Sequence, residues 1–182
     1  MKKIEKILAP TDLSESSLPG LRYALDLGKT IGAEVTVFQV FDSYNEFLQH
    51  GEKIREKAAR DPAFRVPNPY LPFDEFKNIA GLNEELECQI ALRRFLEDHF
   101  SDLLASVRTR EKIEVGKIDK KVVEEAKKEC TDLIVISAPA RTPLAHLLMG
   151  SVSETIARDA PCPVLSIRAE PEEKTVEDLW AA

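Results

Sequence analysis

The sequence predicts a doubly wound α/β domain with a five-stranded parallel sheet. Short apolar runs alternate along the chain with longer segments whose apolar residues have helical spacing. Strands that alternate with helices form parallel sheets covered on both faces. The expected strands are residues 4–9, 35–41, 112–115, 133–136 and 163–167. The expected helices run from the serine-rich segment to residue 31 and over residues 82–107, 119–129 and 155–159.

The first strand leads into a serine-rich segment, residues 14–17, which offers several helix N-caps. Pro19 suits the first turn of the helix, and Gly32 suits the position just after its end. Asp12 therefore lies at the carboxyl end of the first strand, where open α/β sheets bind their ligands. An aspartate in this place binds a ligand or caps the following helix, and the sequence leaves both readings open.

An enlarged insertion at residues 42–81 separates the second strand from the next helix. Residues 45–60 look helical and charged, and prolines then interleave with aromatic residues. This interleaving favours docking, either as packing on the domain itself, as a lid over the sheet edge or against a second subunit. We predict one domain over residues 1–168, followed by an acidic tail at 169–182.

Composition excludes several classes of function. The 182 residues are 43% hydrophobic and 31% charged, with a net charge of −7, which disfavours nucleic acid and anionic membranes as partners. No apolar run of about 18 residues suggests a membrane span. The charged N-terminus does not read as a signal peptide. Three widely spaced cysteines suit a reducing cytoplasm, so we expect a cytoplasmic protein.

Motifs of common enzymes are missing. The chain has no GxxxxGK[ST] phosphate loop, no GxGxxG after a strand and no GxSxG elbow. The three histidines, at positions 50, 99 and 146, do not have metal-ligand spacing. We therefore expect no catalytic residues, no metal site and no enzymatic activity.

The stretch from 131 to 168 organises the chain as strand, loop, helix and strand. Gly150 and Ser151 open the last helix, where free backbone N–H groups and the helix dipole favour an anion. The alternative is that Ser151 or Ser153 only caps the helix.

The segments KKIEKILAPTDLSESS and LIVIS…LLMGSVSETIARDAPCPVLSI resemble the universal stress protein family. The resemblance covers the whole core. It implies the strand order 3-2-1-4-5 of adenine nucleotide alpha hydrolase-like folds and a homodimer through the edge strand at 163–167. It also implies a cytoplasmic stress-response or regulatory role without an established reaction. One branch of the family binds ATP through a Gly-x-x-Gly-x9-Gly-[Ser/Thr] loop, and another branch lacks this loop.

This loop motif matches the sequence in part. Gly150 and Ser151 match its end, whereas Ser137 and Ala140 stand where its first two glycines are expected. Arg141 offers a charge to a phosphate. The resemblance implies a site for ATP or AMP made of Pro10, Thr11, Asp12, Val40, Ile136, Ser137, Ala140, Arg141, Gly150, Ser151, Val152 and Ser153. The alternative is a nucleotide-free scaffold that acts through dimer and partner contacts.

Within this interpretation, backbone of Val40 is expected at the adenine, and Asp12 and Ser137 near the ribose. The lost glycines are expected to weaken the site. Restoring glycine at 137 and 140 should then tighten ATP binding.

Overall fold

The computed structural model describes residues 3–42, 49, 53, 73–138 and 151–168. The strands are β1 (Lys6–Thr11), β2 (Glu34–Phe41), β3 (Arg108–Val115), β4 (Leu133–Ala138) and β5 (Val164–Arg168). The helices are the short 3-10 helix η1 (Glu15–Ser17), α1 (Leu18–Ile31), α3 (Phe73–Leu104), α4 (Ile118–Lys128) and α5 (Ser151–Asp159). Apart from 49 and 53, the helix expected over 45–60 lies outside the described residues, as do the proline-rich segment up to 72 and the tail.

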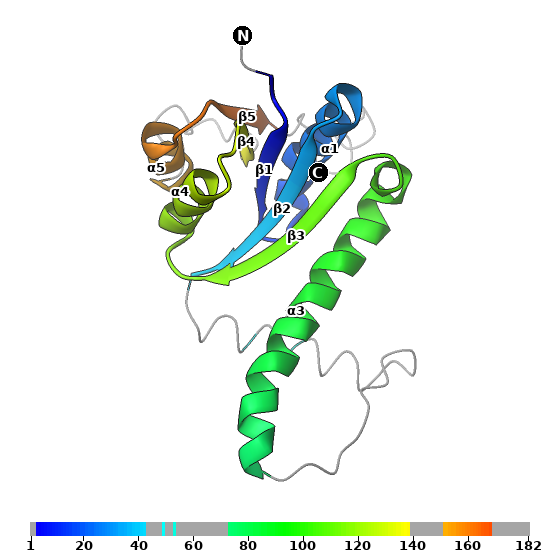
Figure 1. Cartoon of the computed structure of the whole chain (residues 1–182), viewed down its shortest axis with the longest axis vertical. Coiled ribbons are helices and arrows are strands. Elements are labelled where there is room, and N and C mark those ends of the chain that lie inside the picture. Colours follow the sequence, from blue (N-terminus) through cyan, green and yellow to red (C-terminus); the bar gives the residue numbers. More distant parts are fainter. Residues whose placement is uncertain (1–2, 43–48, 50–52, 54–72, 139–150, 169–182) are drawn as a thin grey trace, which may run out of the picture.

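All five strands form one parallel sheet in the order β3-β2-β1-β4-β5, which confirms the predicted fold class and strand order (Figure 1). From β1 the chain builds one side of the sheet through β2 and β3, and it then returns to build the other side through β4 and β5. A reversal of this kind leaves a crevice at the carboxyl ends of the two central strands. Here these central strands are β1 and β4.

Each face of the sheet has its own core. Ala9 and Val37 face α1 and α3, whereas Leu8 and Phe38 face α4 and α5, and all four are at most 1% exposed. The two helix pairs lie on opposite sides of the sheet in Figure 1. Full burial of a large apolar side chain contributes about 1.5–3 kcal/mol, so these two cores hold the helices against the sheet.

Helix α1 packs closely on the sheet and stops as predicted. Pro19 lies in its first turn, and Gly32 follows its last residue with φ of 71°, a conformation that glycine adopts without strain. The residues of its buried face are Gly20, Leu21, Ala24, Leu25 and Gly28.

Strand β1 extends further than expected, because Pro10 and Thr11 belong to it. On the β4 side, β1 pairs only at Ile7 and Leu8. Beyond these residues no ladder with β4 exists for the missing N–H of Pro10 to interrupt. The two central strands therefore separate before they end.

The bounds of β3 and α3 also differ from the prediction. Strand β3 begins at Arg108 rather than 112. The sequence does not predict the first half of this edge strand, because Arg110 and Lys112 interrupt the apolar run there. In the structure these side chains pair with Glu129 and Glu125. Helix α3 begins at Phe73 rather than 82 and ends at Leu104 rather than 107. Residues 73–81 contain no proline, and the one glycine among them, Gly81, costs only about 1 kcal/mol in a helix, which the segment tolerates. Of the helices that the structure describes, none is long and apolar enough to cross a membrane.

Candidate functional site

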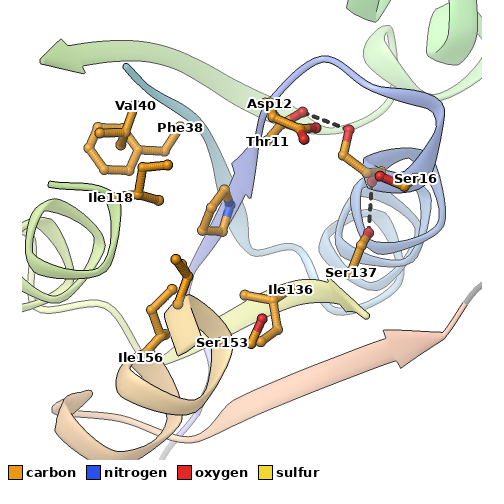
Figure 2. A pocket seen from close by; sticks show the side chains of 13 residues that line it. Thr11, Asp12, Ser16, Phe38, Val40, Ile118, Ile136, Ser137, Ser153 and Ile156 are labelled. Carbon is orange, nitrogen blue, oxygen red and sulfur yellow. Dashed lines mark hydrogen bonds between the residues drawn. The ribbon is translucent and has the colours of Figure 1, made fainter. Parts of the chain in front are cut away.

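The crevice between β1 and β4 holds a pocket of about 240 Å³ (Figure 2). It opens where the β1–β4 ladder has stopped, at the carboxyl ends of both strands. Its lining comes from β1, η1, β2, α4, β4 and α5: Pro10, Thr11, Asp12, Ser16, Ser17, Phe38, Val40, Ile118, Ile136, Ser137, Val152, Ser153 and Ile156.

One wall of the pocket is apolar. Phe38 and Val40 reach it from β2, Ile118 from the start of α4, and Ile136 and Ile156 from β4 and α5. Phe38, Ile136 and Ile156 are at most 5% exposed, because they also belong to the core beneath α4 and α5. The wall is therefore set by core packing, and it suits a flat ring with little polar edge on that side.

The opposite rim is rich in hydroxyl groups and carries one carboxylate. The Asp12 Oδ1 accepts hydrogen bonds from the backbone N–H of Ser14 at 3.0 Å and from its hydroxyl at 2.5 Å. The Thr11 and Ser17 hydroxyls lie 2.8 Å apart, and the Thr11 oxygen accepts the N–H of Leu13 at 3.0 Å. These bonds shape residues 11–17 into a fixed loop above the pocket. Asp12 thus caps this loop at Ser14 rather than α1 itself, and it also lines the pocket. Its role toward a ligand stays a prediction.

Leu13 has a strained backbone. Its φ is 60°, a conformation that costs about 1–3 kcal/mol in a residue other than glycine. Packing of its side chain against the core beneath α1 and the N–H bond to Thr11 offset this cost. The strain is located at the pocket rim, which is where functional sites concentrate such conformations.

Ser137 lines the pocket, but its hydroxyl forms hydrogen bonds with the backbone of η1 and α1. It accepts the N–H of Gly20 at 2.8 Å and donates to the carbonyl of Ser17 at 2.9 Å. In Figure 2 this side chain points toward the start of α1, away from Ser153 and Ile156. The serine that replaces the first motif glycine therefore joins β4 to α1.

The N-terminus of α5 completes the pocket with Val152 and Ser153. The positive end of a helix dipole and the free N–H groups of a first turn stabilise an anion at this position. The described part of the site thus has an apolar wall, a hydroxyl and carboxylate rim, and a helix terminus.

A partly buried ion pair, between half-buried Lys112 and buried Glu125, lies behind the apolar wall. The Lys112 ammonium contacts Glu125 at 2.5 Å and Glu114 at 3.1 Å, and it lies 5.9 Å from the ring centroid of Phe38. Burial alone would lower the pKa of Lys112, but hydrogen bonds to Glu125 and Glu114 outweigh it and raise the pKa. Lys112 stays charged, and it joins α4 to the edge strand β3 without itself lining the pocket.

Eight of the predicted site residues line this one pocket: Pro10, Thr11, Asp12, Val40, Ile136, Ser137, Val152 and Ser153. Ser151 is the first residue of α5, and its side chain lies outside the described residues. Ala140, Arg141 and Gly150 also lie outside them. The role of each residue toward a ligand stays a prediction.

Five lining residues were missed in the sequence: Ser16, Ser17, Phe38, Ile118 and Ile156. Phe38 had a signal, because it precedes Val40 by two positions on a strand and so faces the same side. Ile118 and Ile156 depend on how α4 and α5 pack, which no local pattern gives. In the described part of the chain, no three His, Cys, Asp or Glu side chains gather in a way that could hold a metal ion.

The sequence profile of the universal stress protein family matches residues 3–64 and 68–168. A universal stress protein of Methanocaldococcus jannaschii is 29% identical over 172 residues, which span 90% of this chain and 82% of that protein. A second universal stress protein of the same organism is 25% identical and spans 90% of this chain and 94% of its own. The stress response protein NhaX of Bacillus subtilis is 25% identical, with coverage of 90% and 98%.

Solved structures show the same fold. The universal stress protein UspA of Lactobacillus plantarum has a TM-score of 0.57 at 20% identity and covers 92% of this chain and 100% of its own. A universal stress protein solved in complex with cAMP also has a TM-score of 0.57, at 16% identity, with coverage of 92% and 98%.

Proposed function

Because the chain belongs to the universal stress protein family, we propose that it is a regulatory stress-response protein that binds an adenine nucleotide, ATP or AMP, between β1 and β4. The observation that carries this proposal is the pocket at the reversal of strand order. Eight residues that the sequence assigns to a nucleotide site lie around it, and ligands of open α/β sheets bind at such reversals. A solved protein with this fold was determined in complex with cAMP, which supports an adenine ring as the occupant.

The apolar wall is the proposed place of the adenine ring, with the backbone of Val40 at its polar edge. Phe38, Ile118 and Ile156 offer apolar surface to the ring. The ribose then lies at the rim, where the Asp12 carboxylate accepts a hydroxyl. A hydrogen bond to a charged acceptor contributes about 1.5–3 kcal/mol, so the loss of the Asp12 carboxylate is expected to have a measurable effect in this arrangement.

The phosphates lie at the N-terminus of α5 in this proposal. Ser153 lines the pocket there, and the N–H groups of the first turn supply donors. The family resemblance adds Gly150, Ser151 and Arg141 to this part of the proposed site. In the sequence motif, Ala140 occupies a position where a glycine is expected.

The test is calorimetry of the full chain with AMP and with ATP, together with mass spectrometry of gently purified protein for a retained nucleotide. Asp12→Asn removes the charge but keeps the oxygen that caps the loop, and we expect it to weaken binding by about tenfold or more. Asp26→Asn, at an exposed position of α1, is the matched control and should bind as the wild type does. If neither nucleotide binds at millimolar concentration, the proposal fails and the nucleotide-free function is favoured.

A nucleotide-free scaffold that acts through dimer and partner contacts is the second candidate function. Among the residues that the structure describes, β5 pairs only with β4, and Val164, Leu165 and Ile167 are half-buried on it. An unpaired strand edge is a ready surface for a second chain. We propose a homodimer through β5, which is compatible with either function. The proposed role is cytoplasmic and does not involve catalysis.

A further inference from the structure

We propose that Ser137 is a positioning residue for the nucleotide. Its hydroxyl fixes the distance between the two walls of the crevice, and it does not contact the ligand. This inference rests on the proposed nucleotide site. It assigns a role to the residue that replaces the first glycine of the phosphate-loop motif.

The hydrogen-bond ladder between β1 and β4 does not set the width of the crevice. These strands pair only at Ile7 with Leu133 and at Leu8 with Ile134. Beyond that point β1 pairs with β2 alone, and β4 pairs with β5 alone. Backbone hydrogen bonds therefore fix each wall to its outer neighbour and leave the spacing between the walls to side chains.

A chain of hydroxyl groups spans this gap. Ser137 donates its proton to the carbonyl of Ser17 at 2.9 Å. The Ser17 hydroxyl donates to the carbonyl of Ser14 at 2.7 Å, so the 2.8 Å bond between Thr11 and Ser17 has Thr11 as its donor. In Figure 2 the dashed lines that reach Thr11 and Ser137 mark the two bonds to Ser17, whose side chain is drawn without a label. The chain joins the end of β4 to the end of β1.

We call the linked hydrogen bonds of Ser137, Ser17 and Thr11 the hydroxyl clamp. The first turn of α1 packs closely against this clamp and restricts the Ser137 side chain. Ser137 also accepts the N–H of Gly20 at 2.8 Å. A Cβ atom on Gly20 would lie 2.5 Å from the Ser137 oxygen and 2.8 Å from its backbone nitrogen. Helix and strand therefore approach as closely as a glycine allows, and the hydroxyl fills the space between them. Its one proton is committed to Ser17, so it has none to offer a ribose or a phosphate.

The clamp reverses one expectation from the motif. If position 137 only obstructed a phosphate loop, Ser137→Gly would tighten binding. If Ser137 holds the crevice at its working width, Ser137→Gly and Ser137→Ala both weaken binding, because the walls must be ordered when the ligand binds. We expect about a tenfold loss of affinity for AMP and for ATP, the size that corresponds to one or two lost hydrogen bonds.

The experiment is calorimetry of AMP and ATP with the full chain, at a temperature well below the unfolding midpoint of each variant. Ser137→Thr keeps the hydroxyl and should bind more tightly than Ser137→Ala. Ser166→Ala, an exposed serine on the neighbouring strand β5, is the matched control and should leave affinity unchanged. Hydrogen exchange of the Gly20 amide should accelerate in Ser137→Ala but not in the control.

A second variant interrupts the same series of hydrogen bonds at its other end, at Thr11. Thr11→Val removes the bond to Ser17 and should weaken binding by a similar factor, and the double variant with Ser137→Ala should lose little more than either single one. If the wild type binds and Ser137→Ala or Ser137→Gly binds equally or more tightly, the positioning role is wrong and the nucleotide site stands. If the wild type binds neither nucleotide, both proposals fall.

Discussion

The substitution Gly20→Ala tests how closely α1 packs on β4, through its effect on the free energy of unfolding. In Gly20→Ala the new methyl group would lie 2.5 Å from the Ser137 oxygen, 2.8 Å from the Ser137 nitrogen and 3.1 Å from the carbonyl carbon of Ile136. Two of these atoms are backbone and cannot rotate away. The helix must therefore shift, which costs about 1–3 kcal/mol, and it loses part of the Gly20 hydrogen bond, worth about 1 kcal/mol.

Helix propensity acts in the other direction, since alanine is favoured over glycine by about 1 kcal/mol inside a helix. The net expectation is a loss of about 1–3 kcal/mol in the free energy of unfolding, measured by urea denaturation. For a chain of this length each kcal/mol lowers the melting temperature by about 2–4 °C. A variant that is stabilised by about 1 kcal/mol, as propensity alone predicts, would refute the close contact.

Gly28 provides the matched comparison on the same helix. A Cβ there would lie 2.5 Å from a methyl group of Val35, so Gly28→Ala should cost less when Val35→Ala has removed that methyl group. For Gly20→Ala, the removal of the hydroxyl with Ser137→Gly leaves the strand backbone in place, and most of the cost should persist. Equal rescue at both positions would contradict the backbone origin of the Gly20 cost.

Four further predictions concern other parts of the fold. Cys130 follows the C-cap of α4 and has a φ of 53°, so Cys130→Gly should raise the free energy of unfolding by about 0.5–1 kcal/mol, measured in urea. No gain would refute strain there. Lys112→Met leaves Glu125 buried without its cation and should cost about 3–5 kcal/mol. Burial alone would raise the pKa of Glu114, but lysine contacts outweigh it and lower the pKa. Its contribution is therefore present above the unfolded value of about 4.3, and acid titration of stability should show a loss as the pH falls below it. Ser166→Lys on the exposed edge of β5 should weaken a dimer in sedimentation, and a wild-type monomer at micromolar concentration would exclude that interface.

Much of the fold follows from local patterns, and the misses have physical causes. The runs at 35–41 and 133–136 predicted β2 and β4 because strands buried on both faces are continuously apolar. The run at 4–9 predicts β1 but not its end, because proline lacks the N–H that a strand ladder needs and Pro10 therefore suggests that the strand stops. The first half of β3 was missed because its charges pair with neighbouring carboxylates, and a pattern of alternating charge resembles a loop.

The candidate site was predictable only where its residues share one sheet edge. Asp12 and Ser137 follow or end strands, so parallel topology brings them together. The Ser137 hydroxyl bond to Gly20 joins residues 117 positions apart, and no local sequence feature reports which way a hydroxyl turns. For the same reason Ile118 and Ile156 emerged only when α4 and α5 were placed on the sheet.

The missing motif glycines and the apolar wall of the pocket concern different parts of the proposed site. Glycine is needed where backbone must approach a phosphate closely, and this requirement concerns positions 137 and 140. The apolar wall depends instead on Phe38 and Ile156, which are fixed by the core beneath α4 and α5 whatever residue occupies the loop. Substitution of the glycines therefore bears on the proposed phosphate contacts, and it leaves the apolar wall unchanged. A degenerate motif in this family is thus weak evidence against a base-binding pocket, and the hydroxyl clamp gives one way in which such a chain keeps the crevice formed.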